Sequence, residues 1–176
     1  MTLPPATPDT KDWTWVLERP CPECGFDAAG TALAQVPQAL RENAAGWAGV
    51  LTGPDVARRP APRTWSPLEY ACHVRDVHRV FGGRYEQMLR ADDPLFADWD
   101  QDAAAAAGDY PGQPPADVAR DLVAGAEQVA VRLESLTPDD VERPGRRSNG
   151  SRFTVTSLAR YHLHDVVHHA WDVGTG

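Results

Sequence analysis

Apolar residues recur along this chain at steps of three and four, which is the spacing of one buried face of an α-helix. The first such stripe lies in residues 31–51, where Pro37 marks or kinks the first turn. This stripe consists of Leu33, Val36, Leu40, Ala44, Trp47 and Val50. The spacing predicts a helix whose apolar face is buried.

A second helix is predicted for residues 67–90, and its start is the clearest local signal in the chain. Ser66 is a favourable N-cap residue, Pro67 fits the first helical position, and Glu69 completes a capping box. The apolar stripe that follows consists of Tyr70, Val77, Val80 or Phe81, and Met88. His73 falls on the same stripe, so its imidazole is expected to face the interior.

Residues 91–115 are rich in Asp, Pro and Gly and contain a tract of alanines, which predicts a long loop with room for one helical turn. Long loops in compact domains often carry function. A third helix is predicted to follow Pro115 and to stop before Pro138, because a residue that precedes proline disfavours the helical conformation. Its heptad-like stripe consists of Val118, Leu122, Val129, Leu133 and Leu136.

The polar stretch 137–151 predicts a connection, and a last helix is predicted over 154–172, ended by Gly174. Four helical segments without a run of alternating strand residues favour an all-α fold, a four-helix bundle. We expect an irregular N-terminal arm over residues 1–28, because its prolines and glycine prevent a long helix, and the bundle over residues 29–176.

Composition favours one domain with one core, since 42% of the 176 residues are hydrophobic. No apolar run approaches the roughly 20 residues of a membrane span, so no membrane partner is expected. The net charge of −8, with scattered arginines, lacks the basic face that nucleic-acid binding requires. Residues 1–10 show no secretion signal, which favours a cytoplasmic protein. The expected partner is a small-molecule substrate, and the bundle can also pair as a homodimer.

The last predicted helix contains four of the six histidines of the chain. At about 100° per residue, His164 and His168 share one face, whereas His162 and His169 share another. The first pair continues a seam that is expected to face the bundle interior, together with Ser157, Tyr161 and Trp171. Two imidazoles four residues apart can clamp a divalent ion, and His73 can supply a third ligand from the second helix.

A purely structural interpretation of these histidines stays open. A single inward-facing histidine is more often a hydrogen-bonded core residue than a metal ligand, and His73 taken alone fits that description. Two buried imidazoles on one helix face, however, lose their hydration unless something satisfies them, and a metal ion does so. The spacing alone supports metal ligation and core packing about equally.

The cysteines are a second candidate for metal chemistry. Cys21 and Cys24 enclose a Pro-Glu pair and precede Gly25, which resembles one zinc knuckle. A structural zinc ion needs four ligands, so the other two would have to be histidines or come from a second chain. A redox pair or two free thiols are equally compatible with the sequence. Cys72 points about 100° away from His73 and is expected in the core.

Several of these motifs, in this order and separation, resemble the DinB/YfiT-like family, which includes the mycothiol-dependent maleylpyruvate isomerases. The residues that carry the resemblance are Trp65-Ser66-Pro67-Leu68-Glu69 followed by His73, Leu136-Thr137 with Asp139-Asp140, and Thr154-Val155 with Leu158 and His164-x-x-x-His168. The resemblance covers most of residues 30–174. It implies a four-helix bundle in which His73, His164 and His168 bind zinc, nickel or a similar divalent ion. The isomerases have a glutamate at the first position of the last-helix pair, where this chain has His164.

Three neutral histidines would leave a coordination position open, which is typical of catalytic sites. Many members of the family that the chain resembles transfer or isomerise substrates with a low-molecular-weight thiol such as mycothiol or bacillithiol. The resemblance therefore implies a divalent-metal-dependent enzyme, either a thiol-cofactor-dependent transferase or isomerase, or a hydrolase that activates water. The alternative is a non-catalytic metal-binding or stress-response protein of the same fold.

Further residues could assist such a site. Arg84 is the candidate for binding an anionic group of a cofactor or substrate, although arginine is also common on helix surfaces. Asp76 and Asp165 could orient imidazoles, and a solvated surface position is the favoured interpretation for Asp165. Trp99, Asp100 and Tyr110, in the long loop, could cover the mouth of the site, with simple packing as the favoured interpretation for Trp99.

Overall fold

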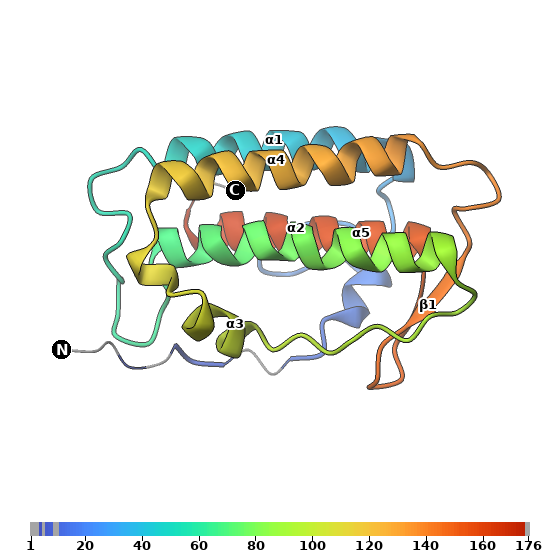
Figure 1. Ribbon diagram of the computed structural model, residues 1–176, viewed down its shortest axis with the longest axis horizontal. Helices are drawn as coiled ribbons and strands as arrows, with labels where there is room; N and C mark the ends of the chain where they lie inside the picture. Colours follow the sequence, from blue (N-terminus) through green and yellow to red (C-terminus); the bar gives the residue numbers. More distant parts are fainter. Residues whose placement is uncertain (1–3, 5, 9–10, 175–176) are drawn as a thin grey trace.

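The computed structural model describes residues 4, 6–8 and 11–174. Its long helices, α1 (Val36–Val50), α2 (Pro67–Arg90), α4 (Pro115–Glu134) and α5 (Val155–Asp172), lie alongside one another as a bundle (Figure 1). The predicted all-α, four-helix fold is therefore confirmed. No helix among the described residues is long and apolar enough to cross a membrane.

The order of the helices around the bundle differs from their order in the chain. Helix α4 packs between α1 and α2, and α5 packs against the other sides of the same two helices. Consecutive helices α1 and α2 thus lie on a diagonal. Because α2 and α4 run in the same direction, residues 91–114 must return along the length of the bundle, and they carry α3 (Gln101–Ala107) and the 3₁₀ turn η3 (Tyr110–Gly112) (Figure 1).

Local capping explains where α2 and α5 begin. At α2, the Glu69 N–H donates to Ser66 Oγ at 3.2 Å, and the Ser66 N–H donates to the Glu69 carboxylate at 2.9 Å, as the capping-box pattern predicts. At α5, Thr154 and Ser157 form an equivalent reciprocal pair. Helix α1 begins after a short 3₁₀ turn, η2 (Leu33–Gln35), so the predicted helix over 31–51 is too long at its start.

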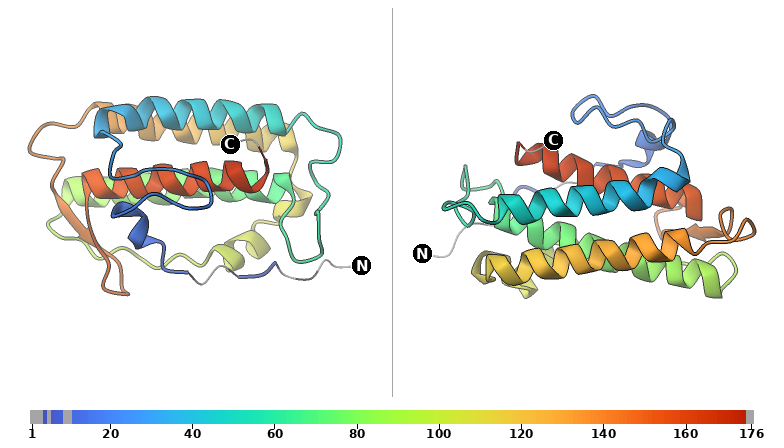
Figure 2. Two further views of the ribbon diagram at one scale, coloured as in Figure 1. Left: turned by 180° about the vertical axis from the view of Figure 1, so that it is seen from behind. Right: turned by 90° about the horizontal axis from the view of Figure 1, so that it is seen from above.

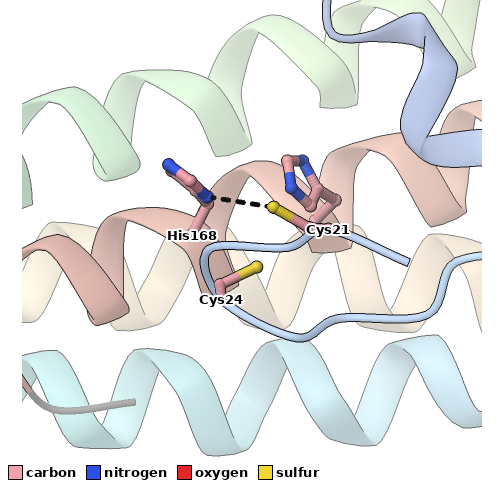
Figure 3. A group of neighbouring side chains, drawn as sticks. Cys21, Cys24 and His168 are labelled. Carbon is pink, nitrogen blue, oxygen red and sulfur yellow. Dashed lines mark hydrogen bonds between the residues drawn. The ribbon is translucent and has the colours of Figure 1, made fainter. Parts of the chain in front are cut away.

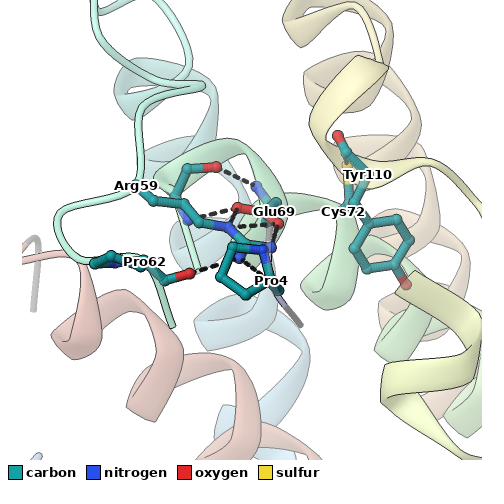
Figure 4. Close-up of polar contacts among 7 residues, drawn as sticks. Pro4, Arg59, Pro62, Glu69, Cys72 and Tyr110 are labelled. Carbon is teal, nitrogen blue, oxygen red and sulfur yellow. Dashed lines mark hydrogen bonds and ion pairs between the residues drawn. The ribbon is translucent and has the colours of Figure 1, made fainter. Parts of the chain in front are cut away.

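The start of α2 is also fastened by a buried ion pair. Arg59, in the connection after α1, donates a bidentate pair of hydrogen bonds to Glu69, whose side chain is only 2% exposed (Figure 4). The same guanidinium donates to the carbonyl oxygens of Pro4 at 2.6 Å and Pro62 at 3.0 Å. Arg59 therefore holds the α1–α2 connection and the N-terminal segment against one helix terminus.

A small antiparallel hairpin, β1 (Pro144–Arg146) and β2 (Arg152–Thr154), occupies part of the stretch predicted as a polar connection. Strands of three residues are too short to show an alternating pattern in the sequence. Gly145 is required here, because a Cβ at this position would lie 2.5 Å from Cζ of Phe96. The hairpin leads directly into α5.

The N-terminal arm folds across α5 (Figure 2). Its 3₁₀ turn η1 (Thr14–Leu17) contacts α5, and Val16 is fully buried there. A tight turn follows, in which Cys21 N–H donates to the Phe26 carbonyl and Gly25 N–H donates to the Cys21 carbonyl, both at 2.9 Å. Gly25 has φ of +75°, a conformation that favours glycine.

The interior seam of α5 differs from the predicted one. The residues of α5 that face the core include His162, together with Val155, Leu158, Ala159 and Val166. His162 lies 3.1 Å from His78 Nδ1 and 3.2 Å from the Tyr85 hydroxyl, in a buried polar chain. His164 and His168 are buried as well, but the arm covers them, and Trp171 of the predicted seam is 42% exposed.

Candidate metal centre

Helix α5 carries two pairs of potential ligands side by side. His164 and His168 form one pair at a separation of four residues, and Asp165 and His169 form the other. Because successive residues are about 100° apart on a helix, the two pairs face different neighbours. The first pair faces the N-terminal arm and the second pair faces α2.

The group that faces α2 consists of His73, Asp165 and His169, whose potential ligand atoms all lie within 4.8 Å of one another. His73 Nε2 is 3.8 Å from Asp165 Oδ1, and His169 Nε2 is 3.6 Å from the same oxygen. These separations exceed hydrogen-bonding distance. The three side chains therefore converge on a common point at the distances of ion pairs, with no hydrogen bond recorded among them.

Buried atoms of this group have no hydrogen-bond partner among the described residues. They are both ring nitrogens of His73 and Oδ1 of Asp165. Such atoms are nearly always satisfied, because stripping a polar group of water without compensation costs about 1–3 kcal/mol. Two imidazoles and one carboxylate are a common donor set for a catalytic divalent ion, with bonds of about 2.0–2.2 Å. The residues present thus fit a metal ion.

Neighbouring residues hold these three side chains in place. The His73 ring stacks on Trp99 at a centroid distance of 5.3 Å and meets the His169 ring edge-on at 4.7 Å. The His169 Nδ1–H donates to Asp172 at 2.9 Å, so Nε2 is the nitrogen that faces Asp165. Burial lowers the pKa of His73, and the Asp165 carboxylate opposes this effect. A neutral imidazole, the form that binds metal, is therefore favoured at position 73.

A pocket of about 300 Å³ adjoins this group, and Asp165 and His169 form part of its wall. Arg84 and Arg147 line the same pocket. Arg84 is 8% exposed and lies over the rings of Phe81 and Phe96, and its pKa is lowered by burial and by the nearby Arg147. Within the described part of the chain, no carboxylate lies within 4.0 Å of either guanidinium. The pocket thus places a group of potential metal ligands beside two guanidinium groups that have no carboxylate partner among the described residues, and Lys11, Asp100 and Asp102 also line it.

The group that faces the arm consists of Cys21, Cys24, His164 and His168, again with all potential ligand atoms within 4.8 Å of one another. Figure 3 shows the turn of the arm lying over α5, with the two sulfurs near His168. The distance from Cys21 Sγ to His168 Nδ1 is 3.7 Å. Burial raises the pKa of the Cys24 thiol to about 11, with the Phe26 N–H acting in the opposite direction.

The structure therefore distributes the predicted ligands His73, His164 and His168 between two groups. His73 is buried on α2 as expected, but its partners are Asp165 and His169. The sequence interpretation set His169 aside and favoured a surface position for Asp165. The sequence feature behind this grouping is a second i, i+4 pair, shifted by a single residue, whose first member is a carboxylate.

The other candidates have simpler roles. Asp76 accepts hydrogen bonds from the Tyr110 hydroxyl at 2.6 Å and from Arg75 and Arg79 at 3.0 Å, so it organises the long loop. Tyr110 is fully buried by packing and does not line the pocket. Trp99 lines the pocket and stacks on the His73 ring.

Comparison with known proteins agrees with this architecture. The family model described as the DinB superfamily matches residues 8–173. A solved structure of YfiT from Bacillus subtilis is similar, with a TM-score of 0.73 and 18% identity over 81% of this chain and 85% of that one. YfiT is described as a probable metal-dependent hydrolase with an unusual four-helix bundle topology. No curated protein sequence matches the chain.

Proposed function

Because the chain belongs to the DinB superfamily, we propose that it is a divalent-metal-dependent enzyme whose ion is held by His73, Asp165 and His169. The observation that carries this proposal is the set of buried, unpartnered ligand atoms on His73 and Asp165 beside a pocket. The description of YfiT as a probable metal-dependent hydrolase supports it. Zinc or nickel suits a site of two imidazoles and one carboxylate.

This ligand set replaces the one that the sequence alone suggested. The resembled isomerases have a carboxylate at the first position of the last-helix pair, and Asp165 supplies one here, whereas His164 does not. Three protein ligands leave room for a further ligand on the pocket side. A divalent ion held there would lower the pKa of a water or thiol nucleophile and polarise an electrophilic substrate.

The remaining pocket residues bind and enclose the substrate. Arg84 and Arg147 attract an anionic group, since neither guanidinium has a carboxylate partner within the described residues. Tyr161 lines the pocket next to them, and Trp99 covers His73 and limits access of water. The substrate or thiol cofactor is therefore expected to carry a negative charge.

Two nucleophiles are compatible with this site. The first is the thiolate of a low-molecular-weight thiol such as mycothiol or bacillithiol, which would make the protein a transferase or isomerase. The second is water, which would make it a hydrolase, and the description of YfiT favours this candidate. Both require the metal ion and both use the same pocket.

Metal analysis of the purified chain tests the proposal. His73→Ala, Asp165→Asn and His169→Ala should each lose one equivalent of metal per chain, whereas Asp76→Asn, a carboxylate of α2 outside the group, should lose none. Thiol transfer from mycothiol or bacillithiol to an electrophile, and ester or amide hydrolysis, are then assayed with and without a chelator. Full metal retention by Asp165→Asn, or activity that survives chelation, would contradict the proposal.

A further inference from the structure

We infer that Cys21, Cys24, His164 and His168 form a second metal site, a structural zinc site that fastens the N-terminal arm to α5. The site shares no ligand with the group of His73, Asp165 and His169. Its ligands can therefore be tested separately from those of the proposed enzymatic site.

The arm supplies two sulfurs from a turn that is shaped for metal binding. In the segment Cys21-Pro22-Glu23-Cys24-Gly25, the Gly25 N–H donates back to the Cys21 carbonyl, and the left-handed conformation of Gly25 closes the turn. Helix α5 supplies two imidazoles separated by one turn. In a tetrahedral zinc site, ligand atoms lie roughly 3.3–3.8 Å apart, given bonds of about 2.3 Å to sulfur and 2.0–2.1 Å to nitrogen. The four side chains, within 4.8 Å of one another, need only small rotations to reach this geometry.

The ring nitrogens of His164 and His168 are placed so that a metal ion could bind them. His164 is 3% exposed, and its buried Nε2 has no hydrogen-bond partner among the described residues. His168 directs Nδ1 toward Cys21 at 3.7 Å and Nε2 toward the Glu23 carboxylate at 3.3 Å. With the Nε2–H donated to Glu23, the Nδ1 lone pair is free for the metal, which is the outer-sphere arrangement that orients zinc-binding histidines.

The donor set is that of a structural site. Two thiolates and two imidazoles complete a tetrahedron, so no position remains for substrate. On zinc binding, the two thiols each release a proton to solvent as the two sulfur–zinc bonds form, with no change of oxidation state. The ion would hold the arm in place, including Trp13, which lines the pocket. The Trp13 ring packs on the rings of His164 and His168, with centroid distances of 5.5 and 4.8 Å.

Zinc counting and cobalt substitution test this site in the full chain. The wild-type protein should contain two equivalents of divalent metal, at least one of them zinc, and Cys21→Ser and Cys24→Ser should each contain one. After exchange with cobalt(II), the wild type should show a thiolate-to-metal charge-transfer band in the near ultraviolet, and Cys24→Ser should lose much of its intensity. Cys72→Ala, which removes the remaining cysteine, should keep both equivalents and the full band.

A further variant tests the site even if the cysteine variants do not fold. Glu23→Gln keeps all four ligands but weakens the orienting contact to His168, so its thiolate-bound zinc should dissociate to a chelator about 10-fold faster. Unchanged dissociation would count against the assigned geometry. A wild-type protein without the thiolate band, or one in which Cys21 and Cys24 are joined by a disulfide after purification, would overturn the inference.

The two metal sites can fail separately. If His73→Ala loses one equivalent and keeps the thiolate band, both sites stand. If His73→Ala keeps both equivalents while Cys24→Ser loses one, the structural zinc site stands and the proposed catalytic ligands are wrong. The opposite pattern, with Cys24→Ser keeping both equivalents, overturns the structural site alone.

Discussion

At the scale of single residues, adjacent positions on one helix have different chemical surroundings. His168 faces two cysteines and Glu23, whereas His169 faces His73 and Asp165. Helical arithmetic alone identifies the pairs 164/168 and 165/169 as equally good clamps. The choice between them depends on which helix or loop each residue meets. Substitutions of buried polar side chains can measure how such surroundings affect stability.

We predict that Arg84 lowers the free energy of unfolding of the protein and that it contributes to activity by binding an anion. Its buried guanidinium lacks a carboxylate partner within the described chain, so Arg84→Met should raise the free energy of unfolding by about 1 kcal/mol while lowering activity. Urea denaturation and the activity assay measure the two effects. Arg79→Met, whose side chain is 71% exposed, is the control and should change neither much. A destabilised Arg84→Met would show that Arg84 is a packing residue.

The buried chain Tyr85–His162–His78 is predicted to contribute to stability through its hydrogen bonds. Burial holds the pKa of His78 at about 4 and that of His162 well below its ordinary value, so both rings are neutral. Tyr85→Phe leaves His162 Nδ1 without its hydrogen-bond partner and should lower the free energy of unfolding by about 1–2 kcal/mol. Thermal and urea unfolding provide the measurement. Tyr161→Phe is the matched control, and an equal effect in both variants would refute the assignment.

At the scale of elements, the start of α2 determines where His73 lies. The Ser66–Glu69 capping box fixes the first turn, and the pair of Glu69 with Arg59 fixes the approaching connection. Burial raises the pKa of Glu69, but hydrogen bonds from Arg59 and Ser66 outweigh it, and the net pKa lies below the ordinary 4.5. The ionised carboxylate therefore stabilises the folded state.

The pH dependence of this contribution follows from its sign. Because the folded-state pKa of Glu69 is depressed, the stabilisation is fully present above pH 4.5 and is lost as the pH falls through the folded-state value. Glu69→Gln should lower the free energy of unfolding by about 2 kcal/mol at neutral pH. The deficit should shrink in acid. Urea denaturation across this range checks it, with the more exposed Glu86→Gln on the same helix as control. A deficit that is independent of pH would contradict the role of the charge.

At the scale of the whole molecule, the arm and the long connection between α2 and α4 both contribute to the walls of the pocket. The arm brings Trp13 over His164 and His168, and the connection brings Trp99 over His73. The helices α1, α2, α4 and α5 pack directly on one another, so the bundle does not depend on the arm for its core. The arm is therefore expected to be detachable without loss of the helical fold.

Val16→Asp tests this division. A charge at a fully buried, apolar position cannot be solvated, so the arm should detach and the free energy of unfolding should fall by about 2 kcal/mol. In the metal-free protein, hydrogen–deuterium exchange should become fast in residues 11–28, while the helical circular dichroism signal is retained. Glu18→Lys, an exposed position in the same segment, should leave exchange unchanged. Slow exchange of the arm in Val16→Asp would argue against a separable arm.

Local signals were sufficient to predict the helices, the capping box at Ser66, the burial of His73 and the four-helix fold. Each of these features depends on contacts within a few residues or on a periodic apolar stripe, and both can be recognised in the sequence alone. The three-residue strands lacked enough length to show a pattern, and no local feature indicated that α1 and α2 would lie on a diagonal.

The sequence by itself determined that α5 carries adjacent pairs of potential ligands at helical spacing and that two cysteines flank a turn. Only the tertiary structure decided their partners, because the rotation of α5 about its axis depends on how Val155, Ala159, His162 and Val166 pack in the core. A rotation of one residue, about 100°, exchanges one pair for the other. With His162 inside, Asp165 and His169 meet His73, and His164 and His168 remain on the side where the arm brings its cysteines.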